Sequence, residues 1–185
     1  MKILLLASGG GSLAKAIIDA KIDNVEIVAL ISDKQSPALE IARQAVEIDI
    51  YLPMTTDRSE WNKKLIESVA RFTPDLVVSV GFMKILPPEF LEKFQTINTH
   101  PALLPHFPGA HAVRDALAAG VKKTGTTVHW VDEGVDTGPI IAQLELEIQS
   151  GEDEESLHER IKILERSLIV ETLSRFATNG IPENR

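Results

Sequence analysis

The sequence has no cysteine, no long apolar run and no cluster of basic residues. The missing cysteines exclude disulfide bonds, thiolate catalysis and cysteine-ligated zinc or iron–sulfur centres, and they fit a reducing compartment. No segment approaches the ~18 consecutive apolar residues of a transmembrane helix. The apolar stretch at residues 3–7 ends at a glycine-rich turn, short of the ~7 to 15 residues of a signal-peptide core. We therefore expect a cytoplasmic protein that does not bind membranes.

Acidic residues outnumber basic ones by 27 to 19, which gives a net charge of −8 with histidine neutral and a pI near 5.1. Nucleic acids and anionic membranes select clustered Lys and Arg, so this balance argues against both partners. The 185 residues are 44% hydrophobic and 25% charged, which suffices for one buried core. The composition predicts a single domain spanning residues 1–185.

Strand and helix patterns alternate along the chain, which is typical of an α/β fold. Near-continuous apolar runs indicate strands buried on both faces of a parallel sheet. We expect a mostly parallel twisted sheet with helices on both faces, a Rossmann-like architecture without internal repeats or linkers. The expected strands are residues 3–7, 25–31, 48–52, 75–80, 97–100, 126–131 and 140–148. The expected helices are residues 13–20, 38–46, 59–72, 87–94, 112–119 and 154–176, the last with an apolar stripe of Leu157, Ile161, Leu164, Leu168 and Leu173.

The first candidate site is the glycine-rich turn at residues 8–12, between a predicted strand and a predicted helix. Backbone N–H groups and the helix dipole favour a phosphate there. The turn lacks the Gly-Lys-Ser/Thr of a Walker loop. Gly9 and Gly11 match the first two glycines of a dinucleotide fingerprint, but position 14 is Ala. A tight turn that binds nothing is the alternative interpretation.

Asn98 and His100 form a second candidate site, because two residues of spacing on a strand places both side chains on one face. Open α/β sheets bind ligands beyond the carboxyl ends of their strands, where this pair is predicted to lie. Pro101 restricts the backbone of His100 to extended conformations. The alternative is that both side chains only satisfy backbone groups of the proline-rich loop that follows.

Asp136 is the third candidate, in an acidic loop that could equally be a solvated turn. His129, on a predicted strand, is expected to pack or hydrogen-bond internally rather than react. His106 and His111 have the spacing of metal ligands, but no nearby carboxylate completes a ligand set. We therefore expect no metal.

Taken together, six ordered motifs make the chain resemble the folate-dependent glycinamide ribonucleotide transformylases, or phosphoribosylglycinamide formyltransferases, over nearly its whole length. The order and separation of these motifs are far more specific than any one of them. The motifs are Ser8-Gly9-x-Gly11-Ser12, Gly81-Phe82-Met83-Lys84-Ile85-Leu86, Asn98-x-His100-Pro101-x-Leu103-Leu104-Pro105, Pro108-Gly109, Gly125-Thr126-x-Val128-His129 and Asp136-x-Gly138-Pro139-Ile140-Ile141.

The resemblance implies transfer of a formyl group from 10-formyltetrahydrofolate to the amino group of glycinamide ribonucleotide in purine synthesis. Asn98 would donate a hydrogen bond to the oxyanion of the tetrahedral centre, and a protonated His100 would add charge stabilisation. Asp136 would order a water, shuttle the proton and raise the pKa of His100. No metal or nicotinamide is implied, and both a monomer and a homodimer remain open.

The resemblance also carries binding residues over, with the nucleotide phosphate bound by the N-terminal part and the folate and catalysis assigned to the C-terminal part. It further suggests a cis peptide before Pro105. The catalytic residues are Asn98, His100 and Asp136. The ribonucleotide-binding residues are Gly10, Gly11, Ser12, Leu13, Arg58, Met83, Pro101 and Glu165. The folate-binding residues are Met83, Lys84, Ile85, Leu86, Val131, Asp132, Glu133, Gly134, Val135 and Asp136.

Two positions depart from the family pattern. Leu13 stands where the family commonly has asparagine, so a side-chain contact near the phosphate is missing. Lys84 stands where arginine is common, which keeps the charge but removes the planar fork for the carboxylates of folate. Both departures concern affinity rather than chemistry.

Several related activities are alternatives. Formyltetrahydrofolate deformylase usually has a second histidine where this chain has Pro101, and an additional N-terminal domain. Methionyl-tRNA formyltransferase is a longer chain with a basic C-terminal domain, whereas this chain is acidic. Sugar-nucleotide formyltransferases would show base-stacking contacts. A non-catalytic nucleotide- or folate-binding protein is the alternative from another class, which the intact Asn98, His100 and Asp136 disfavour.

Overall fold

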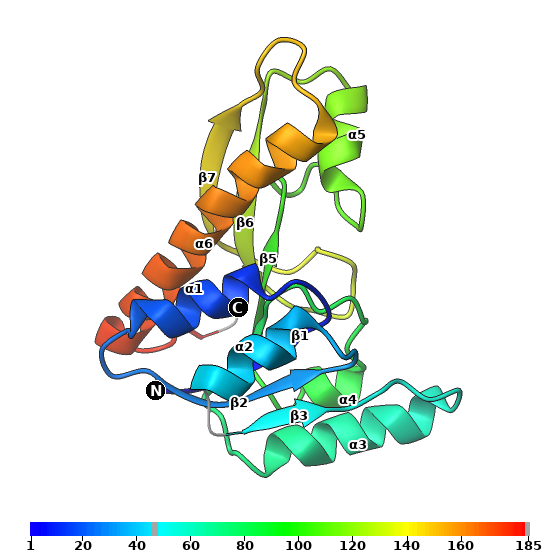
Figure 1. Ribbon diagram of the computed structural model, residues 1–185, viewed down its shortest axis with the longest axis vertical. Helices are drawn as coiled ribbons and strands as arrows, with labels where there is room; N and C mark the ends of the chain where they lie inside the picture. Colours follow the sequence, from blue (N-terminus) through cyan, green and yellow to red (C-terminus); the bar gives the residue numbers. More distant parts are fainter. Residues whose placement is uncertain (46–47, 184–185) are drawn as a thin grey trace.

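The computed structural model describes residues 1–45 and 48–183, and its strands form one sheet (Figure 1). Their order across the sheet is β3-β2-β1-β4-β5-β6-β7. The first five strands pair in parallel, whereas β5 with β6 and β6 with β7 are antiparallel. The predicted mostly parallel sheet is therefore confirmed. The strands are β1 (Lys2–Ala7), β2 (Glu26–Ser32), β3 (Asp49–Tyr51), β4 (Leu76–Ser79), β5 (Thr96–His100), β6 (Lys123–Trp130) and β7 (Ile140–Glu147).

Helices cover both faces of the sheet, as predicted. One face carries α1, α2 and α6, and the other carries α3 and α4; α5 packs against α6 beyond the sheet (Figure 1). In the described part of the chain, no helix is long and apolar enough to cross a membrane. The helices are α1 (Ser12–Ala20), α2 (Pro37–Ala45), α3 (Arg58–Ala70), α4 (Pro88–Leu91), α5 (Ala112–Ala118) and α6 (Glu154–Asn179).

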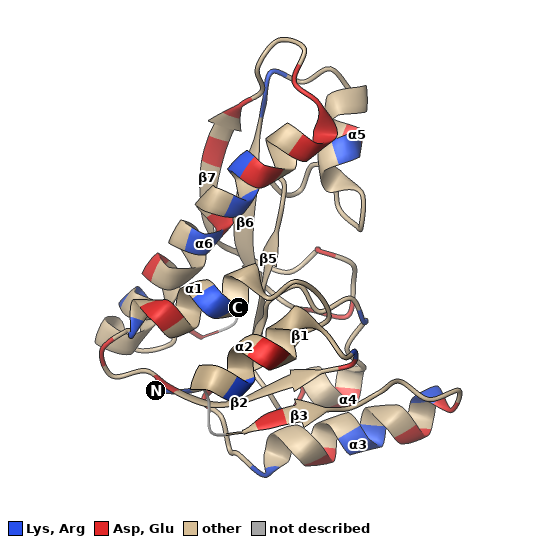
Figure 2. Ribbon diagram, viewed as in Figure 1, with Lys and Arg blue, Asp and Glu red and all other residues tan. Residues whose placement is uncertain are grey.

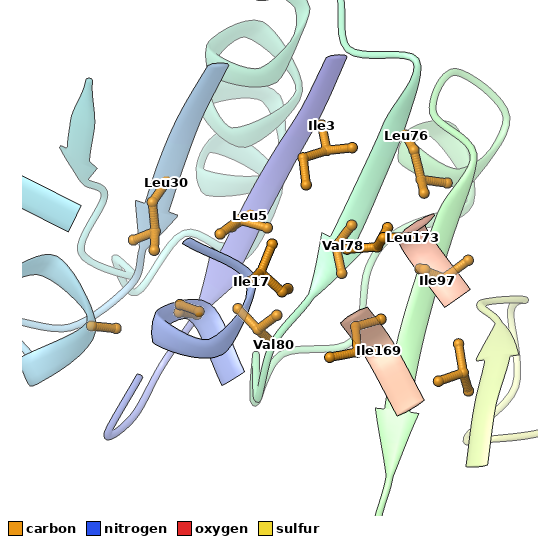
Figure 3. Close-up of a cluster of buried hydrophobic side chains, with 14 of the residues drawn as sticks. Ile3, Leu5, Ile17, Leu30, Leu76, Val78, Val80, Ile97, Ile169 and Leu173 are labelled. Carbon is orange, nitrogen blue, oxygen red and sulfur yellow. The ribbon is translucent and has the colours of Figure 1, made fainter. Parts of the chain in front are cut away.

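The core is divided by the sheet because successive strand residues point to opposite faces. In β1, Ile3 and Leu5 pack with α1 and α6 (Figure 3), whereas Leu4 and Leu6 pack with α3 and α4. All four are fully buried, as near-continuous apolar strands require. Lys and Arg alternate with Asp and Glu along α3 and α6 on the outside (Figure 2). The strand ends, rather than the sheet faces, are thus left to build a site.

Several expected boundaries and one expected position differ from the structure. The helix expected over 87–94 is regular only over Pro88–Leu91, and the strand expected from residue 126 begins at Lys123, where it pairs with the end of β7. The last residue of the helix predicted over 38–46, Val46, lies outside the described residues. On α6, Leu164 is only half-buried, and Glu165 takes the buried position in the apolar stripe.

Candidate active site

Three elements bring the three predicted catalytic residues together. Asn98 and His100 lie on β5 and share one face, as the two-residue spacing predicts. His129 lies opposite Asn98 on the antiparallel neighbour β6. The loop between β6 and β7 returns Asp136 to this group, with a left-handed φ of 55° that Asp tolerates better than most residues. The site therefore lies where the parallel part of the sheet meets its antiparallel extension.

The carboxylate of Asp136 lies between two imidazole rings. Its Oδ2 is 3.2 Å from Nδ1 of His100, and its Oδ1 is 3.5 Å from Nε2 of His129. The backbone N–H of Gly109 donates to Oδ2 over 2.8 Å. Both histidines are buried. Asp136 is thus oriented from three directions by groups that belong to β5, β6 and the proline-rich loop.

Carbonyl oxygens determine which ring nitrogen carries a proton on each histidine, because a carbonyl only accepts. Phe107 O lies 2.8 Å from Nε2 of His100, and Trp130 O lies 2.8 Å from Nδ1 of His129. Nε2 of His129 lies 3.3 Å from the amide nitrogen of Asn98. This contact orients the amide group of Asn98.

The pKa values of the central pair are both shifted downward. Burial lowers the pKa of His100 more than the Phe107 carbonyl and the Asp136 carboxylate raise it. Asp136 does raise the pKa of His100, as expected, but desolvation of the ring is the larger effect, so the expected cationic form of His100 is not favoured. Burial alone would raise the pKa of Asp136, but His129, the Gly109 amide and His100 together lower it. At neutral pH the site holds an anionic carboxylate beside a neutral His100.

The loop after β5 is anchored onto the sheet rather than loosely connected. Thr127 on β6 donates to Ala102 O over 2.6 Å and accepts from the N–H of Leu104 over 3.1 Å. The Leu104–Pro105 peptide is cis, which confirms the expectation from the resemblance. Pro101 lies half-buried directly after His100. The anchored loop brings Phe107 and Gly109 into contact with His100 and Asp136.

The glycine turn leads directly into α1 with Gly11 as its N-cap. Gly11 has φ 75°, and a Cβ there would lie 2.7 Å from the Cα of Ala38, so only glycine fits. No side chain caps the helix, which leaves the N–H groups of the first turn, at Ser12 and Leu13, for another acceptor. Gly10, by contrast, is exposed, and a Cβ there would meet no atom within 4 Å.

A cavity of about 730 Å³ lies between α1 and α6, next to this turn. Ser12 and Lys15 line it from α1, and Arg166 lines it from α6. Glu165 precedes Arg166 on the buried side of α6, with 6% of its surface exposed. Burial raises the pKa of Glu165 to about 7, against the opposing effect of Lys162 and Arg166.

A second cavity, of about 530 Å³, is lined by the first predicted folate segment and by one residue of the second. Met83 to Leu86 line it together with Glu133 from the β6–β7 loop. Arg58 lines this cavity too, stacks 4.6 Å over the ring of Trp61 and donates to Ile85 O. The structure thus places Arg58 beside the predicted folate segments rather than beside the glycine turn.

The β6–β7 loop is closed by its own hydrogen bonds. Asp132 accepts from the N–H of Gly134 and from the hydroxyl of Thr137, over 3.1 and 2.7 Å. The N–H of Val131 donates to Thr96 O, and the side chain of Val135 is half exposed. The predicted folate residues of this loop therefore form one turn between β6 and Asp136.

His129 is the residue whose role sequence reasoning missed. The sequence predicts that it hydrogen-bonds internally, and it does so, but its partners are Asn98 and Asp136. The antiparallel pairing of β5 with β6 places His129 opposite Asn98. A prediction of this pairing would have revealed the contact, whereas the expectation of a mostly parallel sheet does not suggest it. The described residues, His106 and His111 among them, contain no group of three or more His, Asp or Glu that could hold a metal.

A family model described as "Formyl transferase" matches residues 1–173, so this open α/β sheet, which brings the predicted residues Asn98, His100 and Asp136 together, is a formyl transferase domain. A phosphoribosylglycinamide formyltransferase of Mycobacterium tuberculosis is 48% identical, covering 97% of this chain and 86% of that protein. The Escherichia coli enzyme of the same name is 36% identical, covering 96% and 87%. The crystal structure of glycinamide ribonucleotide transformylase 1 from Symbiobacterium toebii superposes with a TM-score of 0.91 at 34% identity, covering 100% and 92%. The chain belongs to the phosphoribosylglycinamide formyltransferase family.

Proposed function

We propose that this protein transfers the formyl group of 10-formyltetrahydrofolate to the amino group of glycinamide ribonucleotide, giving formylglycinamide ribonucleotide and tetrahydrofolate in de novo purine biosynthesis. The observation that carries the proposal is the contact of Asp136 with His100, on the same strand face as Asn98. The 48% identity to a relative of that name supports the substrate pair.

The amine nitrogen attacks the formyl carbon, and the carbonyl oxygen becomes an oxyanion. The Asn98 amide, whose nitrogen lies 3.3 Å from Nε2 of His129, donates a hydrogen bond to that oxygen. In the structure, Nε2–H of His100 donates to the carbonyl oxygen of Phe107. The formyl oxygen is also a carbonyl acceptor, and we propose that Nε2–H donates to it in the complex. One such donor contributes about 3 to 4 kcal/mol to the transition state.

The attacking nitrogen carries a surplus proton after the new C–N bond forms. Asp136 is ionised at neutral pH, so it orders a water that takes this proton. Collapse of the tetrahedral centre then breaks the bond between carbon and N10 of the folate, and N10 receives the proton. The water ordered by Asp136 passes it between the two nitrogens, and Nδ1 of His100 lies 3.2 Å from the Asp136 carboxylate.

The ribonucleotide is proposed to lie between the glycine turn and α6. The backbone N–H groups of residues 10–13 hold its phosphate, and the buried Glu165 faces its sugar or amide. Met83 and Pro101 complete the path to the catalytic group. The N-terminal part of the domain thus binds the phosphate, and the C-terminal part holds Asn98, His100 and Asp136.

The folate is proposed to occupy the cavity lined by Met83 to Leu86 and Glu133 and to extend from there along the rest of the β6–β7 loop, residues 131–136. The exposed side chains of Met83 and Ile85 give this cavity an apolar rim for the pteridine. Arg58 is assigned to this side, because it lines the same cavity.

The test is the release of tetrahydrofolate from 10-formyltetrahydrofolate with and without glycinamide ribonucleotide, with formate measured in parallel. We expect release only with the amine and no formate. Formate without the amine would instead identify a hydrolase. No release of tetrahydrofolate under either condition would contradict the transferase proposal and favour a binding protein.

A further inference from the structure

The segment after β4 alternates between inward and outward side chains. Phe82 and Leu86 are 9% and 6% exposed, whereas Met83 and Ile85 are 68% and 67% exposed. The side chain of Lys84, between the two outward residues, is only 22% exposed. Lys84 therefore takes an inward position, and its two apolar neighbours face the cavity in which the folate is proposed to bind.

Three successive residues of this segment are each attached to a different element beneath it. The N–H of Met83 donates to the hydroxyl of Ser8, at the end of β1, over 2.9 Å. The ammonium of Lys84 lies 3.4 Å from Oδ2 of Asp33, directly after β2. Ile85 O accepts from Arg58, at the start of α3. The position of the segment is thus set by side chains at the ends of three elements.

Asp33 gives the strongest reason for Lys84 to point inward. Its carboxylate is 2% exposed, and its Oδ1 is buried with no hydrogen-bond partner among the described residues. Lys84 is its ion-pair partner there. Removing the cation would leave an uncompensated buried charge, which costs far more than an exposed ion pair gains. Lys84 is therefore not a free cation at the rim of the cavity.

We propose that Lys84 is a positioning residue for the formyl donor, and that Asp33 acts with it. The pair fixes the segment so that Met83, Ile85 and their backbone groups receive the pteridine, and the ammonium does not bind the glutamate carboxylates of the folate. The inference rests on the proposed function for the identity of the donor. The inference also assigns Asp33, which lies in none of the six sequence motifs, to the binding of the formyl donor.

Binding titrations of the full-length protein separate positioning from direct contact. The probes are 10-formyltetrahydrofolate and 10-formyltetrahydropteroate, which lacks the glutamate, both without amine acceptor. We expect Lys84→Met to raise the Kd of both probes by a similar factor of about ten, and Asp33→Asn to raise both in the same way. Lys123→Met, which breaks the exposed pair with Glu145, is the control and should change neither. A Lys84→Met effect confined to the glutamate-bearing probe would overturn the inference.

Urea unfolding at pH 7 tests the pair itself. Lys84→Met should destabilise more than Asp33→Asn, because only the first leaves a buried carboxylate without its cation. The double variant Asp33→Asn/Lys84→Met should regain part of the stability lost in Lys84→Met. Additive losses would overturn the inference. A wild-type protein that binds both probes but formylates no glycinamide ribonucleotide would overturn the proposed function alone, whereas one that binds neither probe would overturn both.

Discussion

The amide of Asn98 faces Nε2 of His129 across the β5–β6 pair at 3.3 Å. The same Nε2 lies 3.5 Å from Asp136, so one buried imidazole connects the proposed oxyanion donor with the proposed proton acceptor. Because Trp130 O holds the opposite ring nitrogen, the ring cannot turn without losing that bond. His129 is thus a positioning residue for both groups.

Replacing His129 should therefore change the pH profile as well as the rate. His129→Phe keeps an aromatic ring but removes the contact that lowers the pKa of Asp136. Activity needs the ionised carboxylate, so the acid limb of kcat/KM should move to higher pH, and kcat should fall about tenfold or more. Steady-state rates between pH 4 and 9 measure both effects. His158→Phe, on α6, is the control. An unchanged acid limb in His129→Phe would contradict the positioning role of His129.

Asp136→Asn should remove most turnover and leave substrate binding nearly intact. Asparagine has the same shape and also tolerates the left-handed φ of 55°, so the loop should keep its conformation. The loss of proton transfer should lower kcat by about 10² to 10⁴ at pH 7.5 with little change in either KM. The control is Asp115→Asn, on the exposed part of α5. A near-normal kcat would exclude Asp136 as the proton shuttle.

Arg58→Met tests which substrate this arginine serves. The variant loses the hydrogen bond to Ile85 O and the cation–π contact with Trp61, both beside the proposed folate cavity. We expect KM for 10-formyltetrahydrofolate to rise about tenfold and KM for glycinamide ribonucleotide to stay within about twofold. Initial rates with each substrate varied in turn give both constants. A selective rise for the ribonucleotide would return Arg58 to the nucleotide side.

Strand periodicity was sufficient to predict that Asn98 and His100 share a face, because side chains alternate along any strand. The contact with Asp136 was not predictable from local pattern, since it depends on how the β6–β7 loop returns over the sheet. The resemblance supplied Asp136, but not its hydrogen bond from Gly109 or the contact with His129. Long-range geometry of this kind has no local signal.

Lys84 and Glu165 show that the surroundings of a charged side chain are also hard to predict from local sequence. The motif placed Lys84 in the folate segment, but the direction of its side chain depends on Asp33, about fifty positions earlier in the chain. Glu165 was found only by resemblance, although it interrupts the buried stripe of α6 four residues after Ile161. A charged residue in an apolar stripe at helical spacing was a usable signal, because carboxylates are rarely buried without a reason.

Gly11→Ala should be far more damaging to folding than Gly10→Ala. A Cβ at Gly11 would meet the backbone of Ala38 at 2.7 Å, at a φ of 75° that disfavours alanine, whereas a Cβ at Gly10 meets nothing within 4 Å. We expect Gly11→Ala to lose about 2 kcal/mol or more in urea unfolding and Gly10→Ala to lose less than about 1 kcal/mol. Equal stability of the two variants would show that the turn moves away from α2 without cost.

Glu165→Gln should change how stability depends on pH. The pKa of Glu165 is about 7 in the folded protein, against 4.5 for an unperturbed glutamate. Between these two pKa values the folded state retains a proton that the unfolded state releases. The contribution of Glu165 to the free energy of unfolding is therefore fully present below pH 4.5 and is lost as the pH rises to about 7. The loss amounts to roughly 3 kcal/mol.

Glutamine cannot titrate, so the variant should gain that amount relative to wild type between pH 4.5 and pH 8. Urea unfolding of both proteins at these two pH values measures the difference directly, and it cancels the opposite pH dependence of His100 and Asp136, whose lowered pKa values favour folding at higher pH. Glu159→Gln, an exposed neighbour on α6, should show no comparable gain. A constant difference between wild type and Glu165→Gln would mean that the pKa of Glu165 is not raised in the folded protein.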